Sequence, residues 1–466
     1  AKDKLARRLN FNDMFFTGVA YMIGAGIFTL MPFVIKYGKK NAILAFIIGG
    51  VLCVFTGLSF SRLNYQYPVN DAEYSWILEI FKKEGEEKPR KGVKAFAAIT
   101  IWVVGIMGIF SMALLALGLY EFINAYKLGI PKRLIIVVSL LFPTIINMIG
   151  VKSVANFAKI IIYLVIASFV FLIGSAGFKG KKKNLLETSL KPDFSNGMNL
   201  VRASFLTIYA FTGFQSVVQL SEETVSKDII PKSITSSVIF VTAIYSLLVL
   251  SIISILGLSN ASSTVYPVSA AFNKVLGTKG RDIVSIISIV TMLSALVILV
   301  LGVSRLFHKL SEKEIAPKYL SKLMSLDSIF YKKEDFNSNS NSNSEISEEE
   351  IQRDVLLQEQ KDKKYKLDKM PIPALLTLFV IAMGLTYIKG GVLELVANAT
   401  NSMLAFIFTV VNLLVVVNYY KSKNLKIDIK NKMIKKLFTM FPWYAVLGFI
   451  VSFIFLILSP KFYDMV

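Results

Sequence analysis

Long apolar stretches alternate with short polar ones along the whole chain of 466 residues. A stretch of about 20 mainly apolar residues can cross the hydrocarbon core of a bilayer as an α-helix. The pattern predicts eleven such helices, at residues 13–38, 42–62, 95–125, 133–149, 155–178, 200–222, 236–258, 282–308, 372–388, 393–420 and 436–458. The expected fold class is therefore an all-α polytopic membrane protein.

Glycines interrupt two of these predicted spans. The first span reads VAYMIGAGIFTLMP over residues 19–32, and the sixth reads FLTIYAFTGFQSVVQLSEET over residues 205–224, with Gly213 near its middle. Non-helical backbone at membrane depth is tolerated only where protein or a water-filled cavity pairs its polar groups. Gly213 alone would also suit close helix packing, whereas the Gly-Ala-Gly triplet of span one favours local unwinding. Spans one and six open two successive sets of five, the arrangement that marks the substrate site of inverted-repeat transporters.

Composition and charge narrow the class of protein. The chain is 54% hydrophobic and 12% aromatic, as expected of a membrane protein. Its net charge of +21 is spread over nearly every loop, so we expect lysines facing lipid headgroups and no binding of nucleic acid. Cys53 and His308 are the only residues of their types, which leaves no disulfide and no His/Cys metal cluster, and we expect no cofactor.

Two other classes of membrane protein lack their sequence marks here. A channel would show repeated filter loops or rings of charge, and neither is present. An enzyme would need clustered catalytic side chains, but the carboxylates lie in loops or at span ends. We therefore do not expect an enzyme.

Basic residues between the spans predict the orientation, because cytoplasmic segments carry the excess of Lys and Arg. With the N-terminus inside, 35 of the 52 basic residues fall on the inner side. The predicted organisation is then a cytoplasmic segment at residues 1–12, spans one to eight at 13–324, a polar loop at 325–370, spans nine to eleven at 371–458 and a tail at 459–466. The loop contains an Asn/Ser repeat followed by mixed charge, which predicts disorder.

Four segments in order along the chain resemble the amino acid-polyamine-organocation superfamily of amino acid transporters. MIGAGIF in span one is similar to its Gly-Ser/Ala-Gly-Ile-Phe signature, and YPVNDAEYSWI (67–77) to its Tyr-Pro-x-x-Gly-Gly-Glu-Tyr segment. YAFTGFQSVVQLSEETVSKDIIPKSI (209–234) resembles its span six and following loop, and GVSRLFHKLSEKEIAPKYL (302–320) the end of its span eight. The resemblance implies a five-plus-five inverted-repeat core with span eleven peripheral. Members commonly have twelve spans, and no clear twelfth is evident here.

The resemblance, taken with the interrupted spans, implies a site for a free amino acid. A zwitterion in a low-dielectric interior needs a partner for each charge. The amides of Ala25, Gly26 and Ile27 open the second half of span one, where the helix dipole favours a carboxylate. Carbonyls such as Met22, Tyr209 and Thr212 can accept hydrogen bonds from the ammonium group. The candidate substrate-binding residues are Met22, Ile23, Gly24, Ala25, Gly26, Ile27, Tyr209, Phe211, Thr212, Gly213, Gln215 and Trp102.

Three of these candidates have open alternatives. Tyr209 and Phe211 either gate the ligand or serve as ordinary aromatic packing, and Trp102 in span three either lines the pocket or packs elsewhere. The scarcity of acidic residues at membrane depth favours neutral amino acids, with cationic amino acids, polyamines or other organic cations as the alternative. The acidic residues concerned all fall near span ends: Glu121, Glu222, Glu223 and Glu394.

Coupling to an H⁺ or Na⁺ gradient stays open in the sequence. Many relatives carry an acidic residue in span six where this chain has Gln215, and an amide cannot titrate. Some relatives place a lysine in span five at the position of a sodium ion. Here Lys159 is either that lysine or one that reaches the inner membrane surface. Thr291 and Ser294 of span eight are candidate sodium ligands or ordinary interhelical contacts.

Overall fold

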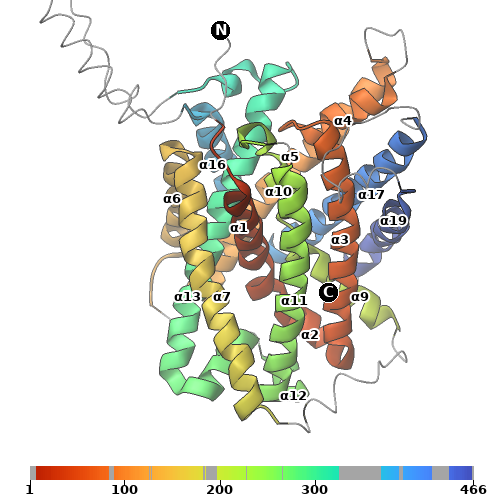
Figure 1. The fold of residues 1–466 in the computed structure, drawn as a ribbon. Helices are drawn as coiled ribbons and strands as arrows, with labels where there is room; N and C mark the ends of the chain where they lie inside the picture. Colours follow the sequence, from red (N-terminus) through yellow and green to blue (C-terminus); the bar gives the residue numbers. More distant parts are fainter. Residues whose placement is uncertain are drawn as a thin grey trace, which may run out of the picture.

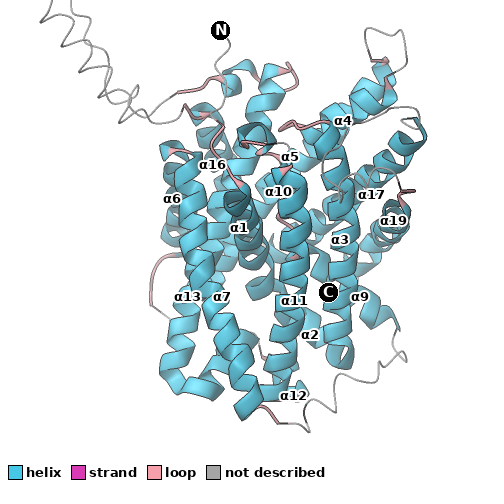
Figure 2. Cartoon of the chain, viewed as in Figure 1, coloured by secondary structure: helices cyan, strands magenta, loops and turns pink. Residues whose placement is uncertain are grey.

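The computed structural model describes residues 7–82, 89–124, 126, 128–181, 184, 197–226, 228–264, 266–324, 369–387, 392–421 and 440–463. Helices make up nearly all of this part, and the β-structure within it is two isolated bridges. The predicted polar loop at residues 325–370 lies outside the described residues except for its last two. The predicted fold class, an all-α bundle of membrane-length helices, is confirmed (Figure 2).

Each predicted span coincides with helical structure. Span one consists of α1 (Phe11–Met22), η1 (Ile23–Ile27) and α2 (Phe28–Gly38), and span six of α9 (Gly197–Ala210), α10 (Phe214–Val218) and η4 (Ser221–Glu223). The other spans are α3 (Ala42–Gln66), α5 (Lys91–Asn124), α6 (Lys132–Ile149), α7 (Val151–Lys179), α11 (Ile229–Leu256), α13 (Pro267–Glu312), α16 (Ile372–Thr386), α17 (Val392–Lys421) and α19 (Trp443–Tyr463). Short elements between them are η2 (Lys39–Asn41), α4 (Ala72–Phe81), α12 (Leu258–Ser263) and η5 (Lys318–Ser321).

The long helices form one bundle in which the two interrupted spans adjoin (Figure 1). Helix α1 packs against α7, α10, α11 and α13, and α2 packs against α9. Elements from the first five spans thus contact elements of the second five throughout. Helix α13 bends at Gly277, whose φ of 73° only glycine adopts easily, so its first turns fold against the end of the bundle. This hairpin explains why α13 begins 15 residues before the predicted span at 282–308.

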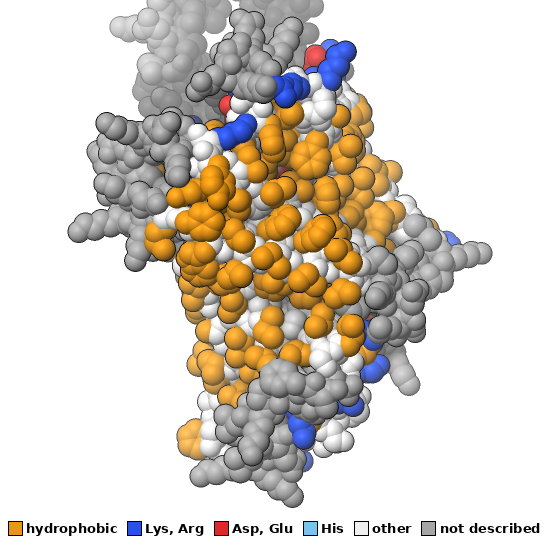
Figure 3. Space-filling view, turned by 90° about the vertical axis from the view of Figure 1, so that its right-hand side faces the viewer, with side chains coloured by type: hydrophobic (Ala, Val, Ile, Leu, Met, Phe, Trp, Pro, Cys, Tyr) orange, Lys and Arg blue, Asp and Glu red, His pale blue; other side chains and the backbone are white. Residues whose placement is uncertain are grey.

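The surface of the bundle suits a membrane. Figure 3 shows a broad apolar belt with lysines and arginines gathered towards its two ends. Seven helices of the described chain are long and apolar enough to cross a bilayer, and two shorter apolar helices lie at Ile372–Thr386 and Trp443–Ser459. Large apolar side chains such as Ile160, Val170 and Val380 are exposed on this belt, where lipid would cover them. The chain is an integral, multi-pass membrane protein.

Ion pairs and polar contacts close the end of the bundle at which α1 begins, hereafter the N-terminal end. Arg305 of α13 donates to Glu223 of η4 through Nε at 2.6 Å, and both side chains are almost completely buried. Beside this pair, the backbone of residues 8–9 bonds with that of residues 223–225, forming the Leu9–Thr224 bridge. The N-terminal segment is thereby attached to the loop that follows span six.

The Arg305–Glu223 pair gives a stability prediction. Glu223→Gln leaves a buried guanidinium without its counter-charge, so we expect a loss of about 3–5 kcal/mol. Combining it with Arg305→Met removes both charges and should recover most of that loss. Thermal unfolding of the detergent-purified protein measures both effects. Asp228→Asn is the control, because the Lys232–Asp228 pair is partly exposed at 3.5 Å and should contribute about 0.5 kcal/mol or less. Equal shifts for Glu223→Gln and Asp228→Asn would contradict the prediction.

Candidate functional site

The interruption of span one is a π-helical turn. Residues Ile23–Ile27 form η1, and Met22, Ile23 and Ile27 keep α-helical dihedral angles, such as φ −65° and ψ −42° at Ile23. The expected local unwinding is therefore wrong for this structure: the helix widens without losing its path. A π turn shifts the hydrogen bonds to i→i+5 and is frequent at functional sites. The amides of residues 25–27 consequently do not open a separate helix N-terminus here.

Gly24 allows span one to approach α13 closely. A Cβ atom at Gly24 would lie 2.5 Å from the Cβ of Ala295 and 2.6 Å from the carbonyl oxygen of Thr291. Both distances are too short for any side chain, so this glycine is required by packing. The side chain of Ala25 and the surroundings of Gly26 are outside what the structure describes.

Span six is interrupted by a true break. Helix α9 ends at Ala210, residues 211–213 form a turn, and Gly213 adopts a φ of 137° before α10 begins. A Cβ atom at Gly213 would lie 2.4 Å from Tyr21 Cδ1 and 3.0 Å from the backbone nitrogen of Met22. The break in span six thus sits directly against the last turn of α1.

Tyr245 of α11 joins the two interruptions. Its hydroxyl lies 2.8 Å from the carbonyl oxygen of Met22 and 3.2 Å from that of Ala210, and its one proton is shared between these two acceptors. Its ring packs on Phe211 with centroids 5.3 Å apart. Sequence reasoning missed Tyr245, because nothing in the sequence sets it apart from the other 18 tyrosines.

The remaining predicted substrate residues divide into two groups. Phe211, Thr212 and Gln215 are buried at the break, and the Nε2 atom of Gln215 has no hydrogen-bond partner. Tyr209 belongs to the last turn of α9, but its side chain lies outside the described residues. Trp102 contacts Phe307 of α13 at 5.8 Å between ring centroids.

The position of Trp102 bears on the two alternatives that the sequence left open. Phe307 lies 12 residues beyond Ala295, the residue that contacts Gly24. This spacing corresponds to about 18 Å along the axis of α13. The structure therefore places Trp102 towards the N-terminal end and not beside the interruptions.

Lys159 binds away from the interruptions as well. Together with Lys152 it forms ion pairs with Asp13, which is fully buried and closes a capping box with Asn10 at the first turn of α1. Asp13 precedes Gly24 by 11 residues, or about 16 Å of helix. This position favours the second predicted alternative, a lysine near the membrane surface, which agrees with the partial exposure of Lys159.

Thr291 lies against the interruption of span one, and Ser294 is buried in the same helix as Thr291. The Thr291 carbonyl oxygen lies against Gly24, and the Thr291 hydroxyl donates to the Ile287 carbonyl at 2.5 Å. The Ser294 hydroxyl is buried without a hydrogen-bond partner. The described residues contain no group of three or more His, Cys, Asp or Glu that could hold a metal ion.

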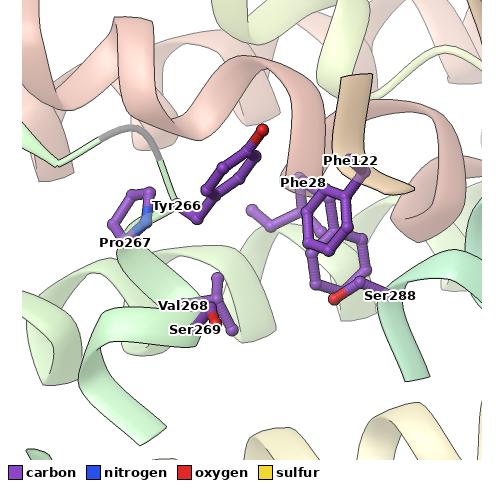
Figure 4. A pocket seen from close by; sticks show the side chains of 8 residues that line it. Phe28, Phe122, Tyr266, Pro267, Val268, Ser269 and Ser288 are labelled. Atoms are coloured by element: carbon purple, nitrogen blue, oxygen red, sulfur yellow. The ribbon is translucent and has the colours of Figure 1, made fainter. Parts of the chain in front are cut away.

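A cavity borders the π turn on the side opposite the N-terminal end (Figure 4). It encloses about 230 Å³ of space, its open mouth included. Phe122 at the end of α5 packs edge-on against Tyr266 with ring centroids 4.7 Å apart. The lining residues are Ile27, Phe28, Phe122, Tyr266, Pro267, Val268, Ser269 and Ser288.

A second set of contacts closes the N-terminal end of the bundle. Asn64 of α3 donates to Ser221 of η4 at 2.6 Å, and Asn70 accepts from the Glu222 amide at 3.0 Å. Lys313, which directly follows α13, pairs with Asp71. These contacts join the ends of spans two, six and eight at this end of the bundle.

Two buried carboxyl groups lie at this end of the bundle, in the segment between spans two and three. Burial raises the pKa of Asp71, an effect that the neighbouring Lys313 ammonium opposes. Burial, together with the charge of Asp71, raises the pKa of Glu73 to about 7. One Glu73 oxygen has no hydrogen-bond partner. Glu73 therefore keeps its proton to a higher pH than a solvated glutamate does.

Gly213→Ala tests the break in span six. Alanine is strained at this φ and would overlap Tyr21, so we expect a loss of about 2 kcal/mol or more in stability. Gly174→Ala in α7 is the matched control, because nothing lies within 4 Å of its added Cβ atom. Thermal unfolding in detergent should show a clear decrease for the first variant and none for the second. Unchanged stability of Gly213→Ala would mean that the positive φ is not maintained.

Glu73→Gln tests the raised pKa of Glu73. The folded protein holds the proton more tightly than the unfolded chain, so Glu73 makes stability fall as the pH rises from about 4.5 to about 7, with no further loss above. The glutamine variant should lack this decrease and be more stable than the wild type at pH 8, by on the order of 3 kcal/mol at most. Unfolding midpoints at pH 5 and pH 8 measure the difference. Parallel pH profiles would refute it.

Comparisons with known proteins identify the family of the chain. A family model described as amino acid permease matches residues 9–464. A serine/threonine exchanger of Bacillus subtilis is 25% identical over 64% of this chain and 67% of its own, and a branched-chain amino acid permease of the same organism is 23% identical over 68% and 70%. A low-affinity putrescine importer of Escherichia coli is 24% identical over 52% and 54%. Because the family model covers nearly the whole chain, this protein belongs to the amino acid permease family, within the amino acid-polyamine-organocation superfamily.

Proposed function

We propose that this permease is a secondary active transporter of neutral amino acids, working by alternating access. The observation that carries the proposal is the contact between the two interrupted spans, where Gly213 lies against Tyr21 and Met22. Backbone groups freed from regular helical pairing are thereby concentrated at one place inside an apolar bundle. Such groups can bind a zwitterion without any charged side chain.

The ammonium group of the substrate would bind the carbonyl oxygens of Met22 and Ala210. Each carbonyl has two lone pairs, so it can accept from an ammonium group beside the Tyr245 hydroxyl. Tyr245 then holds both acceptors in position when the site is empty. The Tyr245 hydroxyl thereby lowers the free-energy cost of burying these carbonyl groups without regular helical hydrogen bonds.

The carboxylate would bind the amides of residues 25–27. These amides become available if the π turn of span one opens, and a π turn is already a departure from i→i+4 pairing. Substrate binding would thus convert η1 into the helix N-terminus that the sequence predicts. This conversion links ligand binding to a movement of α1 relative to α2.

The distribution of buried carboxylates supports neutral substrates. Asp13, Asp71, Glu73 and Glu223 are the buried acidic residues of the described chain, and all lie towards the N-terminal end. At the break, the residue after Phe214 is Gln215, whose polar side chain carries no charge. A cationic amino acid or polyamine would lack a counter-charge at the interruptions, which makes an organic-cation carrier the second candidate.

Alternating access requires one end to close while the other opens. In the predicted orientation, the contacts of Arg305, Lys313 and Asn64 close the inner end, and the cavity beside Phe28 lies on the outer side. The unpaired Ser294 hydroxyl is a candidate ligand for a coupling Na⁺ ion. With an amide at Gln215, coupling through titration of that side chain is not expected.

Uptake by proteoliposomes tests this proposal. We expect the wild type to accumulate labelled neutral amino acids and to be inhibited more by leucine than by lysine. Gln215→Glu places a carboxylate beside the break, so inhibition by lysine should rise by about tenfold, or 1.4 kcal/mol. Imposed Na⁺ and H⁺ gradients, tested one at a time, identify the coupling ion.

The matched control is Gln66→Glu, which adds the same charge at the end of α3, away from the break. It should leave the lysine-to-leucine ratio unchanged. Wild-type uptake of putrescine with no uptake of leucine would favour the organic-cation carrier. Identical ratios in Gln215→Glu and the wild type would mean that Gln215 does not face the substrate.

A further inference from the structure

The cavity beside the π turn has aromatic walls (Figure 4). Phe28 comes from the start of α2, Phe122 from the last turn of α5 and Tyr266 from the residue before α13. The three rings line one cavity although they come from separate parts of the chain. The face of an aromatic ring carries partial negative charge, so a cavity walled by such rings favours a cation over an uncharged group of the same size.

The two serine hydroxyls that line the cavity offer acceptors. Ser288 donates its proton to the carbonyl oxygen of Val284 at 2.8 Å. Ser285 donates to the carbonyl oxygen of Arg281 at 2.8 Å, so the 3.2 Å contact between Ser269 and Ser285 uses the proton of Ser269. Ser269 and Ser288 therefore have only lone pairs left for a ligand, which suit the N–H groups of an ammonium and not a carboxylate.

The charge near the mouth of the cavity is negative. No basic residue is among the described residues that line it. Glu121, which directly precedes Phe122, is exposed. Burial and the charge of Glu121 raise the pKa of Tyr266, so this carboxylate lies close to the Tyr266 ring. A cation that approaches the mouth is attracted by the carboxylate, and an anion is repelled.

The wall that carries Tyr266 is held in place by contacts of the hairpin that bends at Gly277. Lys179 of α7 donates to the carbonyl oxygen of Val275 at 2.7 Å, which ties the first turns of α13 to α7. The edge-on contact between Tyr266 and Phe122 joins this wall to α5. The cavity is therefore formed before any ligand arrives, as binding sites for small molecules usually are.

The cavity directly borders the interruption of span one. Ile27 is the last residue of η1 and Phe28 is the first residue of α2, and both line the cavity. In the predicted orientation the cavity lies on the outer side of the interruption. A ligand bound there would be next to the π turn without occupying the contact between the two interrupted spans.

We infer that this cavity binds the ammonium group of small organic amines, and that it holds the amino end of the substrate before the substrate reaches the interrupted spans. The role in substrate entry rests on the proposed transport of amino acids, whereas ammonium binding does not. The ligand class is any small amine, from primary to quaternary, because the rings recognise the positive charge. A carboxylate on the ligand is not required.

Choline and 3,3-dimethylbutanol provide the sharpest test, because they have the same shape and a carbon atom replaces the cationic nitrogen of choline. The nitrogen of choline has no N–H, so it cannot donate to the carbonyl oxygens of Met22 and Ala210. Each compound is titrated against the detergent-purified full chain, and its affinity follows from the rise in unfolding temperature over matched sodium chloride. The wild type should bind choline about fivefold or more tightly than the alcohol.

Phe122→Leu removes one ring but keeps the wall apolar, so it should reduce the preference for choline to about twofold or less. Phe122→Tyr keeps a ring and should keep the preference, which separates loss of the ring from loss of folding. Phe142→Leu is the matched control, because Phe142 of α6 forms the same kind of edge-on pair with Phe157, at 5.9 Å between centroids. It should leave the preference as in the wild type.

Uptake of labelled leucine tests the role in substrate entry. Choline should raise the KM for leucine in wild-type proteoliposomes and have a smaller effect in those with Phe122→Leu. Equal affinities of the wild type for choline and the alcohol, or an unchanged preference in a folded Phe122→Leu variant, would overturn the ammonium site. An unchanged KM would overturn the entry role. A wild type that binds choline as expected but takes up no amino acid would overturn the proposed function and the entry role, and would support the ammonium site.

Discussion

Every interruption of a helix in this bundle must have its backbone polar groups paired, because the surrounding apolar interior offers them no water. The structure meets this constraint with few residues. The π turn of span one keeps a helical path, and Tyr245 donates to the carbonyl oxygens of Met22 and Ala210 on either side of the contact. Close approach at Gly24 and Gly213 then excludes empty space. The two irregular segments are tolerated because each is covered by the other.

Charge is arranged by the same constraint. Two of the buried carboxylates lie where a lysine or arginine side chain from another helix reaches them, Asp13 beside Lys159 and Glu223 beside Arg305. These pairs gather at one end of the bundle and leave its middle neutral. A neutral middle excludes a strong electrostatic preference, so discrimination among ligands there depends on hydrogen bonds and shape.

The sequence was sufficient for the helices and for the pairing of spans one and six, because hydropathy and glycine placement are local signals. It failed where the answer depends on which residues meet across the bundle. Gly24 looked like a point of unwinding, yet the approach of Ala295 and Thr291 makes it a packing residue. For Trp102 and Lys159 the sequence left two alternatives each, and only their partners Phe307 and Asp13 show where these side chains lie. Tyr245 has no local signal at all.

The backbone bridge between Leu9 and Thr224 has a mechanical consequence. Three hydrogen bonds link residues 8–9 to residues 223–225, and they connect the segment before span one to the segment that follows span six. Neither segment can swing outward alone without breaking all three together. Residues 8–9 therefore separate from residues 223–225 in one step that breaks all three hydrogen bonds. Until that step, the start of span one and the end of span six move together.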